Sequence, residues 1–311
     1  MYKVIILGAG NIAARFDSPN KKEVLTHAHA FSNNAAFQLL GFYDKDYEKA
    51  EEAAKIWGGC AYHDLESALR EADVVSCCVP DSFHGDMLKE IARYNPRLVI
   101  AEKPLAISLK EAEEIEQVYK DRIPLLVNYS RRFLPEFQEL RKQIKDYGKF
   151  VRGVGYYGKG MLHNGSHMID LLSFLLGEAE DIMGLPYENR DFCEEDPSKE
   201  VILKIRQGIF HMIPIDCGIA TIFELDLFFE KARIRILDGG EKIEKHVIKE
   251  SEVYAGYKNY QLSEIQEVNY SGAMEGLVRN AENFLNQTEK LFCSLADGMN
   301  VLRTCMCIRG E

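Results

Sequence analysis

The chain has 311 residues, a net charge of −11, 46% hydrophobic residues and 28% charged residues, which is an ordinary composition for a globular protein. Its length exceeds what one hydrophobic core usually supports, so we expect two domains. The excess of negative charge argues against non-specific binding to nucleic acid or to an anionic membrane.

The sequence shows no sign of a targeting segment or of a membrane span. The apolar run in "MYKVIILGAGNIAARF" ends at glycines, which is unlike a secretory signal. The later run "MIDLLSFLLG" is too short to cross a bilayer and contains Asp170. The eight cysteines include no C-x-x-C pair, so we expect a cytoplasmic protein with reduced thiols and no metal site.

Up to about residue 125, strand-like runs alternate with helix-like segments. The expected strands are "KVIILG", "FQLLGFYD", "DVVSCCVP", "RLVIAEKP" and "IPLLVNY". Between them lie amphipathic helices, one ending at Gly58 and others beginning after the capping residues Asp64 and Ser108. This alternation predicts a doubly wound parallel sheet covered by helices on both faces.

After about residue 125 the pattern changes to consecutive strands, such as "TIFELDLFFEKARIRILDGG", with near-perfect alternation of apolar and polar residues. One helix, "GSHMIDLLSFLLG", interrupts them, and two helices follow near the C-terminus. We therefore predict an α/β protein. Its N-terminal Rossmann domain spans residues 1–125, and an α+β domain with a mainly antiparallel open sheet spans 126–311. The last helix, about 295–309, could pack back on the Rossmann domain.

A glycine-rich turn follows the first strand. "VIILGAGNIA" reads G-x-G-x-x-A, with Gly8 suited to a tight turn, Gly10 to close approach of a pyrophosphate, and Ala13 to helix–strand packing. The helix that begins there would face the phosphates with its N-terminus. We therefore predict a dinucleotide site that includes Asn11 and Ile12.

Asp44 ends the second strand, where an acid accepts hydrogen bonds from the ribose hydroxyls of the cofactor. A carboxylate there repels a 2′-phosphate, so we expect NAD as the cofactor and NADP less so. The gap from Gly10 to Asp44 is longer than the usual spacing of about 20 residues. The segment "DSPNKKEV" in this gap is interpreted as a loop insertion.

His27 and His29 in "THAHAF" could be taken for a pair of metal ligands. Two residues apart on a helix, they point to different faces, and no cysteine or carboxylate cluster accompanies them. We expect packing and polar contacts at the start of a helix instead.

The stretch "AEKP" places Lys103 at the end of a buried strand. Strand carboxyl ends of a doubly wound sheet face the ligand crevice. Because a purely structural lysine would normally lie on a solvated helix face, Lys103 is predicted to be catalytic or to orient the substrate.

"HNGSHMID" contains two histidines near the start of a helix. His167 and Asp170 fall near one face of that helix, and His163 lies just upstream. Histidine titrates near neutrality and can accept or return a proton. His167 and His163 are therefore candidate catalytic residues, and Asp170 is a candidate substrate contact.

Together these features resemble the glucose–fructose oxidoreductase/inositol dehydrogenase (Gfo/Idh/MocA) family. The matching motifs follow in order along nearly the whole chain: "GAGNIA", "DVVSCCVPDSFHGD", "AEKPLAISLKEAEEI", "NYSRRFLPEF", "GSHMIDLLSFLLG" and "LADGMNVLR". The resemblance implies that Lys103 and His167 line the substrate site, and that a cis peptide precedes the proline of E-K-P. It also implies a homo-oligomer, a dimer or tetramer, formed through the open sheet.

Further residues are carried over from the resemblance alone. Val79, Pro80, His84 and Glu102 would border the cofactor, and Asn128 and Arg132 would lie near the active centre. His163 departs from the family pattern, because many members have Asp four residues before the active-site histidine. We expect His163 to contact the substrate or to orient Lys103. The stretches "LTHAHAF" and "GKGMLHNGSHMIDLL" resemble members from surface-carbohydrate pathways, which points towards sugar nucleotides.

The expected function is an NAD(P)-dependent oxidoreductase that moves hydride between a nicotinamide cofactor and a CH–OH group of a sugar, polyol or nucleotide-linked sugar. Two alternatives stay open. One is an enzyme that retains NAD and performs epimerisation or elimination without net redox. The other is a non-catalytic NAD-binding sensor, which would be marked by loss of Lys103 or His167. Both residues are present.

Overall fold

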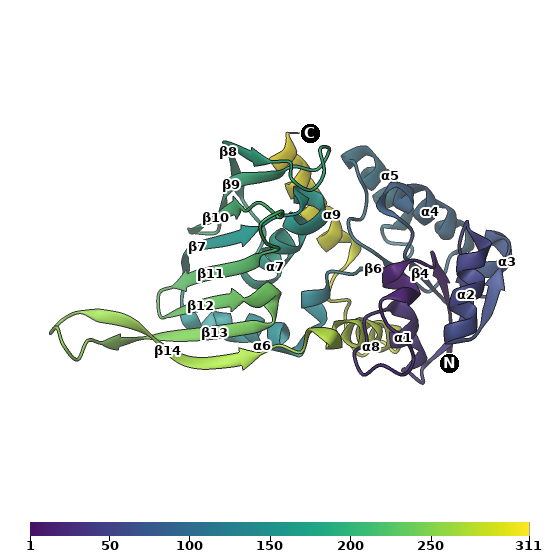
Figure 1. Ribbon diagram of the computed structural model, residues 1–311, viewed down its shortest axis with the longest axis horizontal. Helices are drawn as coiled ribbons and strands as arrows, with labels where there is room; N and C mark the ends of the chain where they lie inside the picture. Colours follow the sequence, from purple (N-terminus) through teal and green to yellow (C-terminus); the bar gives the residue numbers. More distant parts are fainter. Residues whose placement is uncertain (311) are drawn as a thin grey trace. The chain divides into compact units, whose positions relative to one another are not determined.

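The structure is a computed structural model that describes residues 1–310, and the chain forms two compact units (Figure 1). Unit 1 contains Met1–Phe133 and Ser271–Met299, and unit 2 contains Leu134–Tyr270 and the residues from Asn300 on. This division differs from a single boundary after residue 125, because a C-terminal segment returns to unit 1.

Unit 1 is built on a six-stranded, wholly parallel sheet with the order β3-β2-β1-β4-β5-β6. Its strands are β1 (Tyr2–Leu7), β2 (Phe37–Tyr43), β3 (Cys60–Tyr62), β4 (Val74–Cys77), β5 (Leu98–Ala101) and β6 (Leu125–Val127). The direction of winding reverses between β1 and β4, and this makes a switch point at their carboxyl ends. The predicted Rossmann sheet is confirmed.

The connections of unit 1 are helical. They are η1 (Asn11–Arg15), α1 (His27–Ser32), α2 (Tyr47–Trp57), α3 (Leu65–Leu69), η2 (Asp81–Phe83), α4 (His84–Ile91), η3 (Ala92–Tyr94), α5 (Leu109–Tyr119), η4 (Ser130–Phe133) and, after η8 (Tyr270–Gly272), α8 (Ala273–Leu285). Right-handed crossovers place α1 and α2 on one face of the sheet and α4 and α5 on the other, which explains why β4, β5 and β6 are buried along their whole length.

The predicted helix ends are confirmed by cap geometry. The side chains of Asp64 and Ser108 accept hydrogen bonds from the backbone N–H groups of Ser67 and Glu111, respectively. Gly58 ends α2 with a φ of 86°, a conformation that costs glycine little. Strand β3 was not predicted, because its three residues are too few and too exposed to show a period.

Helix α8 belongs to unit 1 because it packs on η4 and on α1. A Cβ atom on Gly276 would lie 2.2 Å from the backbone oxygen of Phe133, so only glycine permits this approach. The segment after α8 also contacts the sheet of unit 1, since Val127 N at the end of β6 donates to Cys293 O at 2.9 Å. The sequence predicts the helix correctly but not the unit to which it packs.

Unit 2 contains an eight-stranded sheet with the order β14-β13-β12-β11-β7-β10-β9-β8. Within the described residues, only β7 and β10 pair in parallel, and the other neighbouring strands of this sheet pair antiparallel, as predicted. The strands are β7 (Phe150–Tyr157), β8 (Asp181–Asn189), β9 (Ser198–Ile205), β10 (Gly208–Pro214), β11 (Phe223–Phe229), β12 (Ala232–Leu237), β13 (Lys242–Glu250) and β14 (Lys258–Glu267). The helices are α6 (Pro135–Gln143), η5 (Ile144–Tyr147), η6 (Gly160–Gly165), α7 (Ser166–Leu176), η7 (Asp238–Gly240) and α9 (Leu295–Arg309), whose first turn is in unit 1.

One face of this second sheet is covered and the other is open. Buried and half-buried residues alternate along β10, β11 and β12, because α7 packs on β7 and α6 packs on α7 from one side only. Strands β13 and β14 extend past β12 as a long hairpin (Figure 1). Among the helices of residues 1–310, none combines the length and the apolar character that a membrane-spanning helix needs.

Candidate functional site

The glycine turn after β1 has the geometry that a pyrophosphate requires. Gly8 has a φ of 88°, and a Cβ atom there would lie 2.6 Å from Cys78 O, so the turn packs directly against the end of β4. Around Gly10, by contrast, a Cβ atom would meet no heavy atom within 4 Å. The backbone is therefore bare where a ligand would approach it.

Asp44 follows β2 and supports this turn. Its Oδ2 accepts a hydrogen bond from Ala9 N at 2.7 Å, and its Oδ1 accepts one from Asp46 N at 2.9 Å. Each carboxylate oxygen can accept a further bond, so these contacts do not exclude a ribose hydroxyl. The acid holds the glycine turn as well as giving the end of β2 its negative charge.

The helical segment after the turn is short. Residues Asn11–Arg15 form one π-helical turn, in which Asn11 is exposed and Ile12 half-buried. The indole of Trp57 lies behind it and donates to Ala14 O at 2.9 Å. The residues of this turn therefore fit a dinucleotide cofactor, with bare backbone at Gly10 and an acid at the end of β2.

The segment between η1 and α1 is a loop, as predicted for the insertion, and a buried carboxylate organises it. Asp17 accepts hydrogen bonds from Leu25 N (2.5 Å), Thr26 N (3.2 Å) and Thr26 Oγ1 (2.6 Å). His29 Nδ1 lies 2.9 Å from the same carboxylate. The prediction that His29 packs and makes polar contacts at a helix start is confirmed, and so is that for His27.

His27 belongs to a chain of buried polar groups centred on Glu102, the residue after β5. His27 Nε2 donates to Glu102 Oε1 at 2.8 Å, and Asn128 Nδ2 donates to the same oxygen at 2.7 Å. On its other side, His27 Nδ1 lies 2.9 Å from Ser76 Oγ in β4. His27 and Ser76 are fully buried, and Asn128 is 4% exposed. The ends of β4, β5 and β6 are thus joined through side chains.

These contacts determine the charge state of Glu102. Burial alone would raise its pKa, but the hydrogen bond and charge of His27, the bond from Asn128 and the charge of Lys103 outweigh burial and hold the pKa below its usual value. Glu102 is therefore a carboxylate at neutral pH. It was predicted to border the cofactor; in the structure it anchors the peptide that carries Lys103.

Lys103 is half-buried and directly follows Glu102 at the carboxyl end of β5. The Lys103–Pro104 peptide bond is cis, as the resemblance implied. Just behind it, the two ring nitrogens of His84 lie within hydrogen-bond distance of two carbonyl oxygens, those of Pro104 (2.6 Å) and Val79 (2.9 Å). The imidazole of His84 thus links the E-K-P turn to the loop after β4, where Pro80 is exposed.

Arg132 has a structural partner that the sequence did not reveal. Its Nη1 donates to Asp297 Oδ1 and to Phe292 O, both at 2.9 Å, and its side chain is 3% exposed. Burial would raise the pKa of Asp297, but the charge of Arg132 and hydrogen bonds from Ser294 hold it below its usual value. A substrate contact by Arg132 stays a prediction.

The two candidate histidines lie in adjoining helical turns of unit 2. His163 lies in η6, is exposed and packs on the ring of Phe192 at 4.8 Å between centroids. His167 is half-buried in the first turn of α7, and Asp170 is buried one turn further along. Their assignments as catalytic and substrate-binding residues stay predictions.

Asp196 fixes the backbone that carries these histidines, a role that was not predicted. Its carboxylate accepts hydrogen bonds from Leu162 N (2.9 Å) and His163 N (3.0 Å). At Gly160, with a φ of 80°, a Cβ atom would lie 2.1 Å from Asp196 Oδ2. The acid in "EEDPSKE" is distant in sequence from its partners, so no local pattern indicated this role.

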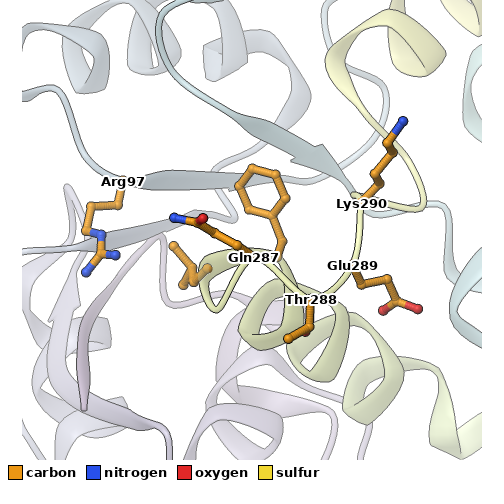
Figure 2. A pocket seen from close by; sticks show the side chains of 7 residues that line it. Arg97, Gln287, Thr288, Glu289 and Lys290 are labelled. Carbon is orange, nitrogen blue, oxygen red and sulfur yellow. The ribbon is translucent and has the colours of Figure 1, made fainter.

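A separate hollow of about 500 Å³ lies at the C-terminal end of α8 (Figure 2). Arg97, which immediately precedes β5, and Gln287, Thr288, Glu289 and Lys290 line it. Because Arg97 marks the amino end of β5 whereas Lys103 follows its carboxyl end, this hollow is not the dinucleotide crevice of the sheet. Across the described chain, no cluster of three or more His, Cys, Asp or Glu side chains is arranged to hold a metal ion.

A parallel sheet in this strand order, with a glycine turn at its switch point, defines a dinucleotide-binding Rossmann domain. Residues 2–128 match the Gfo/Idh/MocA model, described as an oxidoreductase family with an NAD-binding Rossmann fold. The N-terminal domain of the chain is therefore similar to this family, and the predicted resemblance is confirmed for residues 2–128.

Individual relatives agree with this assignment. An inositol 2-dehydrogenase of Rhizobium meliloti is 30% identical over 144 residues, which are 45% of this chain and 40% of the relative. A UDP-N-acetylglucosamine 3-dehydrogenase of Acidithiobacillus ferrooxidans is 30% identical over 115 residues, 37% of this chain and 36% of the relative. The chain thus matches less than half the length of these curated relatives.

Solved structures extend the likeness in fold to the whole chain. The Acidithiobacillus ferrooxidans enzyme superposes with a TM-score of 0.79 at 17% identity, over 99% of this chain and 97% of its own. A 3-ketoreductase from Actinomadura kijaniata in complex with NADP gives 0.75 at 14% identity, over 99% and 97%. At these identities the likeness shows the fold alone, including that of unit 2.

The lowered pKa of Glu102 makes a signed prediction about stability. A depressed folded-state pKa contributes stability above the unfolded value, about 4.3, and loses it as pH falls through the folded value. Glu102→Gln should therefore lower the free energy of unfolding by about 1–3 kcal/mol near neutral pH, and by less in acid. Denaturant unfolding at both pH values measures the difference.

Glu113→Gln, on the exposed side of α5, is the matched control and should change stability little at either pH. A deficit of Glu102→Gln that is equally large in acid would show that Glu102 carries no depressed pKa.

Proposed function

We propose that this protein is an NAD(P)-dependent oxidoreductase that moves hydride between the cofactor and a CH–OH group of a sugar, polyol or nucleotide-linked sugar. The observation that carries the proposal is Lys103, a half-buried cation held at the carboxyl end of β5 by the Glu102 network. A sugar-type substrate is supported by the inositol and UDP-sugar dehydrogenases among the relatives.

The proposed chemistry assigns separate roles to the cofactor, to His167 and to Lys103. Bound NAD(P) would supply the hydride acceptor, held by the turn from Gly8 to Ile12 and by Asp44. In the oxidation direction, neutral His167 accepts the proton of the substrate hydroxyl as hydride leaves the carbon that bears this hydroxyl, and a carbonyl results. Lys103 donates a hydrogen bond to the same oxygen and stabilises the charge that develops there. His163 contacts the substrate or orients Lys103.

Two alternative functions would give different results in an activity assay. An enzyme that retains NAD for epimerisation or elimination would convert substrate without accumulating reduced cofactor. A sensor would bind NAD and convert nothing. Nicotinamide absorbance and product analysis with a panel of polyols, sugars and UDP-sugars separate these three.

The mechanism predicts different kinetic effects for its cation and its base. Lys103→Met should lower turnover about 100-fold, the scale of one lost electrostatic donor, with NAD affinity within a few-fold of normal. His167→Asn should lower it about 100- to 10,000-fold, the span of a general base, and remove the ionisation near neutrality from the pH profile of kcat/KM. His163→Asn should act mainly on KM.

Lys110→Met, on exposed α5, is the matched control for Lys103→Met and should keep full activity. The proposal fails for Lys103 if its variant loses NAD binding and folding together. A neutral-range ionisation that survives in His167→Asn and disappears in His163→Asn would reverse the roles of the histidines.

The choice of NAD over NADP rests on the charge of Asp44. Asp44→Asn keeps an acceptor for Ala9 N but removes the negative charge, so it should narrow the preference for NAD by about 1–3 kcal/mol. Asp46→Asn, the exposed neighbour, is the control and should leave the preference unchanged. Calorimetric titrations in which the unaltered protein prefers NADP would contradict this assignment.

The proposal includes a cytoplasmic location and self-association through the open face of the second sheet. The outward side chains of β11, β12 and β13 form ion pairs, Asp226–Arg233 and Arg235–Glu244, beside exposed apolar residues of β14 such as Leu262 and Ile265. Sedimentation should then show a dimer or tetramer that Leu262→Lys weakens, because a buried unpaired cation opposes association. A strictly monomeric protein would contradict it.

A further inference from the structure

Unit 2 contains a cavity of about 840 Å³ that none of the proposed catalytic residues lines. It lies at the C-terminal ends of α6 and α7, closed by the 144–149 segment and by the turns that join β9 to β10 and β11 to β12. Its size is that of a cavity for a small organic ligand.

The rim of this cavity is strongly cationic. Five cations and one carboxylate line it: Arg141, Lys142, Lys145, Lys149, Arg206 and Glu230. The whole chain, in contrast, has 49 acidic and 38 basic side chains and a net charge of −11. Glu230 is already engaged, since its Oε2 accepts a hydrogen bond from Lys149 N at 3.0 Å. The cavity therefore has a local charge opposite to that of the molecule.

Three of these cations have no carboxylate within ion-pair distance anywhere in the described chain: Lys145, Lys149 and Arg206. Lys142 has one, Glu139 at 3.6 Å, on the exposed surface of α6, where a pair contributes little. In a protein with an excess of acids, unpaired cations gathered at one cavity favour an anionic ligand.

Arg206 occupies a backbone position that would suit another residue better. Its φ of 55° is left-handed, the conformation that glycine and asparagine adopt most readily in a two-residue hairpin turn. Its guanidinium lies about 3.5 Å from where a Cβ atom of Gly177 would be, at the end of α7. The turn thus keeps an unfavourable backbone conformation at a residue whose long side chain reaches the rim of the cavity.

The floor of the cavity is apolar. Phe150, Phe174, Leu175, Leu176 and Phe229 form it, and each is at most 7% exposed. The guanidinium of Arg141 lies 4.5 Å from the centroid of the Phe174 ring, where the two attract each other. A ligand that filled the cavity would place an apolar body on this floor and its charge at the rim.

From this arrangement we infer that the cavity binds a small organic anion, a molecule with one phosphate, sulfonate or carboxylate group on an aromatic or aliphatic body. An extended polyanion is disfavoured, because the rest of the surface repels it. The inference is independent of the proposed oxidoreductase activity, since it uses neither the glycine turn nor the catalytic residues.

The test uses two probes of the same shape, anilinonaphthalene sulfonate and its uncharged analogue N-phenylnaphthylamine. The sulfonate should bind saturably with increased fluorescence, and excess NAD should not displace it. The double variant Lys145→Glu/Arg206→Glu should weaken its binding about tenfold or more, as expected for the loss of charge-assisted contacts. Binding of the neutral probe should change little.

The control is Lys21→Glu/Lys22→Glu, which makes the same change of net charge on the exposed loop of unit 1. The affinity of this control for the sulfonate should stay within about twofold of that of the unaltered protein. The inference is overturned if both double variants weaken binding equally, if neither does, if NAD displaces the sulfonate, or if the neutral probe binds unaltered protein as tightly as the sulfonate does.

Discussion

The carboxylate of Glu102 is the constraint on which the candidate site depends. A buried negative charge is tolerated only with partners, and here His27 and Asn128 both donate to a single oxygen at 2.8 and 2.7 Å. Asn128 follows β6 and His27 contacts Ser76 in β4, so satisfying the charge links the ends of β4, β5 and β6. Lys103 directly follows Glu102, so the same contacts hold its backbone in place.

The same arrangement, a buried or half-buried acid that accepts hydrogen bonds from distant backbone and side-chain donors, recurs at the inserted loop and at the other candidate functional segments of the chain. Asp44 holds the glycine turn through Ala9 N, Asp17 holds the inserted loop through Leu25 N, and Asp196 holds the His163 segment. Loops that carry function need such anchors, because they lack the ladder hydrogen bonds of the elements they join. Several acids of this protein therefore hold loops in place by accepting hydrogen bonds from backbone N–H groups.

The sequence predicts the parts of the fold that depend on local pattern. The capping roles of Asp64 and Ser108, the helix stop at Gly58 and the alternation of β11 need only neighbouring residues. Those features are correct to within a residue or two. The glycine turn is equally local, and its geometry supports the predicted dinucleotide site.

The features that escaped prediction depend on contacts between distant residues. The return of α8 to unit 1 depends on Gly276 meeting Phe133, and Arg132 is paired because Asp297 folds back to it. The sequence indicated polar contacts for His27 but not Glu102 as its partner. Such pairings require the tertiary structure, which a single sequence does not contain.

We expect unit 1 to bind a nicotinamide dinucleotide on the turn after β1. Trp57 is the chain's one tryptophan, and its indole donates to Ala14 O directly behind that turn. Energy transfer from Trp57 to NADH therefore tests the claim most directly. We expect saturable quenching of tryptophan fluorescence with sensitised nicotinamide emission, both reversed by excess NAD. A titration that shows no saturable transfer would contradict it.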